Sequence, residues 1–180
     1  YTGNYSANPQ MPHSLGVAPE MIIAKSRDSV GQWYIKHTGM DNNKDIYFNA
    51  NAASPAAGWS ATATHWQMQA AQYPYDPHIA YLFASLDGVS KVGSYTGTGH
   101  GDGEPLYGNI DCGFSNGARF VMIKRIDSTG DWFFWDTNRG INTGNDPHLS
   151  MNLQAGEVTS DDSIDPYPAG FSVNQNTTTH

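Results

Sequence analysis

The chain has 180 residues, a formal charge of −8, a single cysteine and only 14% charged residues. The scarcity of Lys and Arg argues against a nucleic-acid-binding protein, because phosphate contacts need clustered basic residues. One cysteine excludes an internal disulfide, and no apolar run is long enough to be inserted across a bilayer. Frequent Gly, Asn, Ser, Thr and Pro, with 12% aromatic residues, are typical of an all-β protein rich in turns.

The first predicted element is a β-hairpin over residues 21–38. The apolar run 21–24 suits a half-buried strand, and the aromatic run 33–35 begins the return strand. The residues between them read Lys-Ser-Arg-Asp-Ser-Val-Gly-Gln. Asp and Ser favour a turn because their side chains accept bonds from the backbone two residues on. We expect Gly31 to adopt a positive φ in a short loop closed by a G1 bulge.

Two further predicted strands follow in the first part of the chain. Residues 46–49 read Ile-Tyr-Phe-Asn and form one of them. Residues 79–86 form a nearly continuous apolar run, which is typical of a central strand covered on both faces. Asp87 and Gly88 then indicate a turn.

The same pattern returns in the second part of the chain. Residues 124–132 place Lys, Asp, Ser, Gly and Trp at the positions that they occupy in 25–33. We therefore expect an equivalent hairpin over 120–137, with a positive φ at Gly130. Residues 149–152 match 46–49, and Tyr-Thr-Gly opens both parts of the chain. Matches in the same order indicate an internal repeat.

The predicted fold is an all-β antiparallel sandwich, jelly-roll or Greek-key-like, built from two repeated halves. Residues 1–94 form the first half and 95–180 the second, packed as one domain. The second half lacks a counterpart of 79–86, since His180 aligns near Pro77. We expect residues beyond 180 or a neighbouring chain to supply that strand. The chain starts without Met, which favours a fragment or a processed product.

Several motifs together carry a resemblance to a known family. They are Tyr-Thr-Gly-Asn at 1–4, Pro-His-Ser-Leu-Gly-Val-Ala-Pro at 12–19, and Tyr-Leu-Phe-Ala at 81–84 with Ser-Lys-Val-Gly-Ser-Tyr-Thr-Gly at 90–97. The second half adds the 124–132 motif, Asp136, Thr137 and Arg139. The pattern resembles the repeat of tail-fibre and other appendage proteins of tailed bacteriophages, especially marine and cyanobacterial ones. The resemblance spans nearly the whole chain and implies no catalytic residue.

Aromatic residues are the candidate ligand-binding residues. An exposed ring can stack on the C–H face of a sugar while loop amides and carboxylates bond its hydroxyls. Trp33 and Trp132 occupy equivalent places in the repeat, which favours core packing. The predicted glycan-binding residues lie instead in the segment 54–75, interpreted as half-specific loops. They are Trp59, Trp66, Tyr73 and Tyr75.

Two groups of polar residues can be interpreted either as functional sites or as solvated turns and loops. One is His100, Asp102 and Glu104, in a Gly-rich stretch that offers oxygen ligands for a hard metal ion but has neither EF-hand nor zinc spacing. The other is Asp161, Asp162 and Asp165, a possible acid–base group for glycoside cleavage. Solvated turns and loops are favoured for both. With no Gly-x-Ser-x-Gly elbow, we assign no catalytic residue, metal or cofactor, and Cys112 is expected to pack as a small apolar residue.

The predicted function is a non-enzymatic module of a phage tail fibre or adhesin that contacts bacterial surface glycans. We expect synthesis in the host cytoplasm, a place on the extracellular virion appendage, and a homo-oligomer, with a trimer favoured. The partners are the glycan and other virion proteins, without nucleic acid or membrane insertion. A purely structural fibre or capsid-decoration subunit is the alternative, and a polysaccharide-cleaving enzyme ranks lowest.

Overall fold

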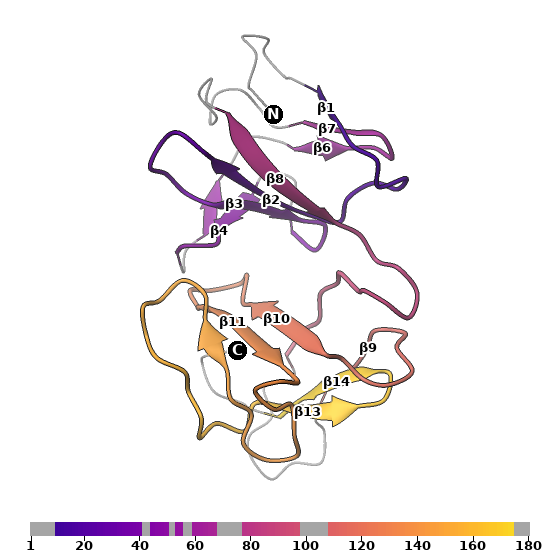
Figure 1. The fold of residues 1–180 in the computed structure, drawn as a ribbon, viewed down its shortest axis with the longest axis vertical. Coiled ribbons are helices and arrows are strands. Elements are labelled where there is room, and N and C mark those ends of the chain that lie inside the picture. The colour runs from indigo at the N-terminus through magenta and orange to yellow at the C-terminus, as the bar shows by residue number, and fades with distance from the viewer. Residues whose placement is uncertain are drawn as a thin grey trace. The chain divides into compact units, whose positions relative to one another are not determined.

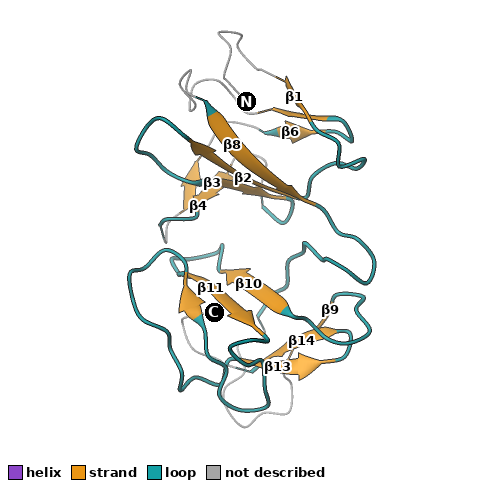
Figure 2. Cartoon of the chain, in the orientation of Figure 1, coloured by secondary structure: helices purple, strands orange, loops and turns teal. Residues whose placement is uncertain are grey.

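The protein is described by a computed structural model that covers residues 10–40, 44–50, 53–55, 59–67, 77–97 and 108–174. These residues form strands, turns and loops without a helix, and every strand pair is antiparallel (Figures 1 and 2). No membrane-spanning helix is found among them. The all-β antiparallel prediction is confirmed. The chain divides into two compact units between Ser85 and Leu86, rather than at residue 94.

The first unit contains two sheets. One has the order β1-β7-β6 and the other the order β5-β4-β3-β2-β8. The strands are β1 Gln10–Pro12, β2 Met21–Ser26, β3 Tyr34–His37, β4 Lys44–Tyr47, β5 Ala53–Pro55, β6 Ser60–Ala61, β7 His65–Gln67 and β8 His78–Phe83. Ile22 and Ala24 of β2 pack with Met11, Trp59 and Trp66 in one buried cluster. Apolar residues from both sheets therefore share one core.

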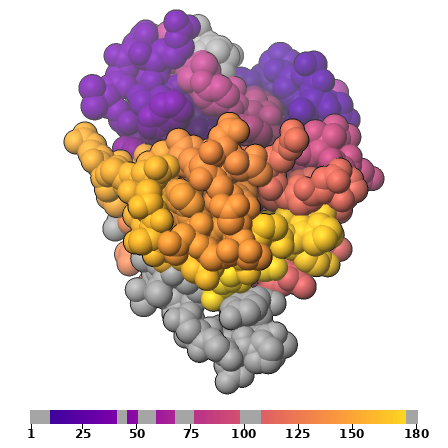
Figure 3. Space-filling model, turned by 60° about the horizontal axis from the view of Figure 1, so that its bottom comes forward, coloured from indigo at the N-terminus to yellow at the C-terminus, as the bar shows by residue number. Residues whose placement is uncertain are grey.

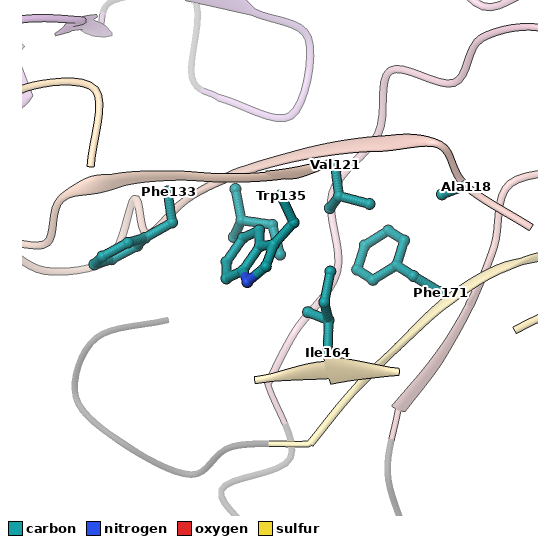
Figure 4. Packing of buried hydrophobic residues seen from close by; sticks show 7 residues of the cluster. Ala118, Val121, Phe133, Trp135, Ile164 and Phe171 are labelled. Carbon is teal, nitrogen blue, oxygen red and sulfur yellow. The ribbon is translucent and has the colours of Figure 1, made fainter. Parts of the chain in front are cut away.

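The second unit also contains two sheets, ordered β10-β11-β12 and β13-β14-β9. The strands are β9 Gly108–Asp111, β10 Phe120–Lys124, β11 Trp132–Asp136, β12 Leu149–Ser150, β13 Ile164–Tyr167 and β14 Gly170–Val173. Figure 4 shows Val121, Phe133 and Trp135 on one side of a core that Ile164 and Phe171 enter from the other. Each unit thus has its own pair of sheets and its own core.

Both predicted hairpins are confirmed, and they pair in equivalent register. Met21 lies opposite His37 in the first unit, and Phe120 lies opposite Asp136 in the second. A shift of 99 residues turns each β2–β3 pair into a β10–β11 pair, because 21 becomes 120 and 37 becomes 136. The third strand of each sheet corresponds as well. Ile35 of β3 lies opposite Ile46, and its counterpart Phe134 of β11 lies opposite Leu149.

The remaining sheet of each unit obeys the same correspondence. Its central strand is β7 in the first unit and β14 in the second. Trp66 lies opposite both Met11 and Ala61. Phe171 likewise lies opposite both Ile110 and Pro166. All strands of the first unit except β5 and β8 therefore have a counterpart among the described residues of the second. The internal repeat itself stays a prediction.

The hairpin loops differ from the predicted turn. Neither Gly31 nor Gly130 has a φ in the left-handed region, so the predicted positive φ is wrong at both positions. Each connection spans seven residues, 27–33 and 125–131, and is therefore longer than the tight turn that needs glycine at a positive φ. Lys25 Nζ donates to the carbonyls of Ser26 and Ser29, at 2.7 and 2.8 Å. Lys124 Nζ likewise donates to the Arg125 carbonyl at 2.7 Å. The Lys25 ammonium group thus holds two carbonyls of its loop, whereas that of Lys124 contacts the carbonyl of the next residue.

Candidate functional site

Trp59 and Trp66 lie in the core of the first unit instead of on a binding face. Their exposed fractions are 7% and 3%, and their rings stack at a centroid distance of 5.9 Å. Neither ring offers the open face that sugar stacking needs. The interpretation of 54–75 as half-specific loops is wrong for this part, because it contains β6 and β7. Trp59 and Trp66 correspond to Ile164 and Phe171, which are core residues of the second unit.

The other predicted binding and metal residues lie outside the described part of the chain. They are Tyr73 and Tyr75 of the glycan prediction and His100, Asp102 and Glu104 of the metal interpretation. Among the described residues, no group of three or more His, Cys, Asp or Glu side chains is placed to hold a metal ion.

Trp33 and Trp132 occupy equivalent places, as the repeat predicted. Trp132 is buried and Trp33 is half-buried. The Trp33 backbone N–H donates to Asn49 Oδ1 at 3.0 Å, and the Trp132 N–H donates to Asn152 Oδ1 at 2.8 Å. In the second unit Asn152 Nδ2 also donates to Asp131 Oδ1 at 2.7 Å. The repeated Asn thus fixes the start of the return strand in both hairpins, which is a structural role.

The acidic residues near the C-terminal end gather around a buried carboxylate that the sequence interpretation missed. Asp146 is fully buried. Its Oδ1 accepts the Asn142 N–H at 2.9 Å, and its Oδ2 accepts the N–H groups of Ser163 and Ile164 at 3.2 and 3.1 Å. Asp146 therefore joins the loop after β11 to the start of β13. Burial raises its pKa from 3.8 to about 6, although the three backbone donors act in the opposite direction.

The three aspartates named from the sequence have partners of their own. Asp161 Oδ2 accepts the Ser163 hydroxyl at 2.9 Å. Asn174 Nδ2 donates to Asp162 Oδ1 at 3.0 Å and to Asp165 Oδ2 at 2.6 Å. Asp162 is exposed, as predicted, whereas Asp161 and Asp165 are half-buried. These bonds close the loop onto the β13–β14 hairpin.

The His148 side chain packs against the aromatic core of the second unit. Its ring is buried against Phe133 and Trp135, at centroid distances of 5.4 and 5.3 Å. Its Nδ1 lies 3.4 Å from the Asp146 carbonyl and 3.9 Å from Asp161 Oδ2. Ser163 Oγ is directed to the Asp161 carboxylate. Both side chains therefore approach the Asp161 carboxylate, which links them to the loop before β13.

Cys112 packs as expected. It is half-buried beside the core of the second unit, and its thiol lies 3.8 Å from the Ile110 carbonyl. Burial raises the pKa of the thiol, which disfavours the reactive thiolate.

A second cluster lies at the end of β11 and in the loop that follows it. We call it the Arg139 cluster, and it comprises Phe134, Asp136, Arg139 and Glu157. The Arg139 guanidinium lies over the Phe134 ring, 5.2 Å from its centroid. It pairs with the carboxylate of Asp136 and, at 3.0 Å, with that of Glu157. The cluster joins a planar cation, an aromatic ring and carboxylates at a partly exposed place, and these groups can all contact a sugar.

The Asp136 carboxylate also holds the turn that follows β11. Its Oδ1 accepts the N–H groups of Asn138 and Arg139, both at 2.9 Å. These backbone bonds, together with the Arg139 side chain, lower the Asp136 pKa. The Arg139 cluster is thus preformed by the turn that carries it.

The chain belongs to a family of unknown function. All 180 residues match the family described as Domain of unknown function (DUF7483). Comparison with curated proteins and with solved structures gave no match.

Proposed function

We propose that this member of the DUF7483 family is a non-enzymatic module of a bacteriophage appendage, which contacts bacterial surface glycans through loops on a β-sheet scaffold. The proposal rests on one observation above all. The two units share strand register, whereas their connections differ. The β3–β4 connection spans residues 38–43, and the corresponding β11–β12 connection spans 137–148. A fixed framework with divergent loops is typical of binding modules.

The second unit provides the better candidate contact surface. The buried Asp146 carboxylate holds the loops between residues 137 and 163 by bonds to the N–H groups of Asn142 and Ile164. Arg139 and Glu157 of the Arg139 cluster lie in the same loops, at a partly exposed place. The same stretch contains exposed residues over much of 151–160. Figure 3 shows orange and yellow side chains of the second unit as a continuous part of the surface. Glycan contact is therefore assigned to these loops in place of Trp59 and Trp66.

Weak single contacts suit this assignment. A guanidinium that is already paired with two carboxylates offers a sugar only part of its hydrogen-bonding capacity. Adhesive appendages compensate by presenting several copies, because linked sites raise the overall avidity without new contacts. The proposal accordingly includes a homo-oligomeric appendage, assembled after synthesis in the host cytoplasm.

Binding of the intact chain to arrayed bacterial lipopolysaccharides and capsular polysaccharides tests the function. Arg139→Ala should weaken binding by about tenfold, the loss expected for one charge-assisted bond and its ring contact. Arg27→Ala is the matched control, because Arg27 is exposed in the hairpin loop of the other unit. Equal loss in both variants would contradict a specific role for the Arg139 cluster.

A purely structural virion subunit is the second candidate, and the place of β10 at the edge of its sheet, among the described residues, favours it. Such a subunit would bind other virion proteins and would show no binding to the arrayed lipopolysaccharides and capsular polysaccharides. Release of reducing ends from a polysaccharide would instead reveal an enzyme.

A further inference from the structure

Strand β10 lies at an edge of its sheet among the described residues. The order is β10-β11-β12, so β10 has a strand on one side alone. The Thr137 N–H donates to the Arg119 carbonyl. Backbone groups alternate between the two sides of an antiparallel strand, so Val121 and Ile123 bond to β11. The N–H and C=O groups of Phe120 and Met122 therefore point to the open side.

The first unit shows what occupies the equivalent edge. Strand β2 corresponds to β10, and β8 pairs with β2 on the side away from β3. Met21 lies opposite Phe83, and Ile23 lies opposite Tyr81. The described part of the second unit supplies no strand at this place.

The occupant in the first unit also completes the core. Ala80 and Leu82 of β8 pack against the cluster that contains Ile22 and Ala24. The counterparts of these two β2 residues, Val121 and Ile123, lie in the core of the second unit. A strand beside β10 would extend that core in the same way.

The β10 edge carries few of the features that block strand addition. Exposed edges are usually protected by charged residues, proline or a bulge. Residues 120–123 read Phe-Val-Met-Ile, and 57% of Phe120 is exposed. Lys124 ends the strand, but its Nζ donates to the Arg125 carbonyl of its own loop.

We propose that the open edge of β10 is a strand-acceptor site for an extended segment of another polypeptide. The segment runs antiparallel to β10 and follows the pattern of β8. Its residue at the Phe83 position lies opposite Phe120, and its residue at the Tyr81 position lies opposite Met122. Small or branched apolar residues at the Ala80 and Leu82 positions face the core. Main-chain bonds provide affinity and the alternating side chains provide specificity, as in other cases of strand addition.

A synthetic peptide of residues 77–86 tests the site on the intact chain. It reproduces β8 and should bind and slow hydrogen exchange of the Met122 amide. In the first unit the Arg27 N–H donates to the Pro77 carbonyl. Backbone groups alternate along the strand, so those of Tyr81 point toward β2, as those of Pro77 do, and those of Leu82 point away from it. Methylation of the Tyr81 nitrogen in the peptide should therefore weaken binding by about tenfold or more. Methylation at Leu82 is the matched control and should leave binding nearly unchanged.

A protein variant examines the same bond from the other side. Met122→Pro removes the N–H that points to the open edge, a position at which edge strands tolerate proline. It should weaken peptide binding, whereas Met122→Val should not. The proposal is overturned if the peptide does not bind, or if both methylated peptides bind equally. It is also overturned if the free chain already protects the Met122 amide, or if two copies pair through β10.

Discussion

Replacement of Asp146 by Asn should change how the stability of the chain depends on pH. The carboxylate is fully buried and accepts three backbone N–H groups. Its pKa is about 6 in the folded chain, against an ordinary value of 3.8. The folded state therefore binds the proton more tightly than the unfolded state. The free energy of unfolding from this group rises as the pH falls through about 6, and the gain is complete below 3.8.

The size of the effect follows from the two pKa values. A difference of one pKa unit corresponds to about 1.4 kcal/mol. The rise from 3.8 to about 6 therefore makes wild type about 3 kcal/mol more stable at low pH than at neutral pH through this group. The amide that replaces the carboxyl group in Asp146→Asn cannot titrate, and its NH2 group would face at least one backbone donor. An unsatisfied buried donor costs about 1–3 kcal/mol.

The titration of the carboxyl group depends on pH, whereas the cost of the unsatisfied backbone donor does not. At pH 7 Asp146→Asn loses acceptor capacity but also removes the burial cost of a charge, so the net change is small. Near pH 4 the folded wild-type chain holds Asp146 largely protonated, so the substitution removes no buried charge. Only the loss of acceptor capacity then remains. Urea unfolding at several pH values should show the stability gap widening by about 2–3 kcal/mol from pH 7 to pH 4.

Asp28→Asn is the control, because Asp28 is exposed in the hairpin loop of the other unit. A gap between wild type and Asp146→Asn that stays constant with pH, or widens toward high pH, would refute the reasoning.

Four further predictions concern the two units, and each is checked by urea unfolding. Asn152→Ala should cost about 2–4 kcal/mol because it removes a bond to the Trp132 N–H and one to a carboxylate, whereas Asn49→Ala should cost about 0.5–1.5; equal losses would contradict the difference in bonding. Trp66→Ala should cost about 3–5 kcal/mol through the cavity left in the core; a folded variant of unchanged stability would restore a surface role. Gly31→Ala should fall within about 0.5 kcal/mol of wild type. Gly170→Ala should be strongly destabilising, because the new Cβ would clash with the Ile110 carbonyl oxygen; a Gly170→Ala variant of unchanged stability would contradict the close β9–β14 approach.

Much of the strand framework could be predicted from sequence because the repeated residues are those that fix it. Lys25 and Lys124 donate to carbonyls of the hairpin loops, and Asn49 and Asn152 hold the return strands. These side chains act on nearby backbone groups, so their spacing carries the information. The hairpins and the alignment of the third strand followed from that spacing.

The failures concern features that depend on distant contacts. Gly31 was interpreted as part of a tight turn, but the connection 27–33 is seven residues long and leaves the Gly31 φ outside the left-handed region. Trp59 and Trp66 belong to very short strands or their flanks, and no repeated motif marks their equivalence to Ile164 and Phe171. Matching strand order, rather than residue identity, was the signal that could have placed them.

Asp146 was missed for a related reason. It lies in a connection that is longer than its counterpart in the first unit, so the repeat offers no residue to compare with it. Its backbone partners at Ser163 and Ile164 lie far along the chain. A lone Asp beside Gly and Asn reads as a solvated turn residue until those partners are known.

Nuclear magnetic resonance contacts between facing α-protons test the shared framework most directly. In an antiparallel ladder the non-hydrogen-bonded pairs bring Cα atoms to about 4.5 Å and give strong contacts. Such contacts should join Ile23 to Ile35 in the first unit and Met122 to Phe134 in the second. Contacts shifted by one residue in either hairpin, or absent from one of them, would contradict a single framework that is used twice.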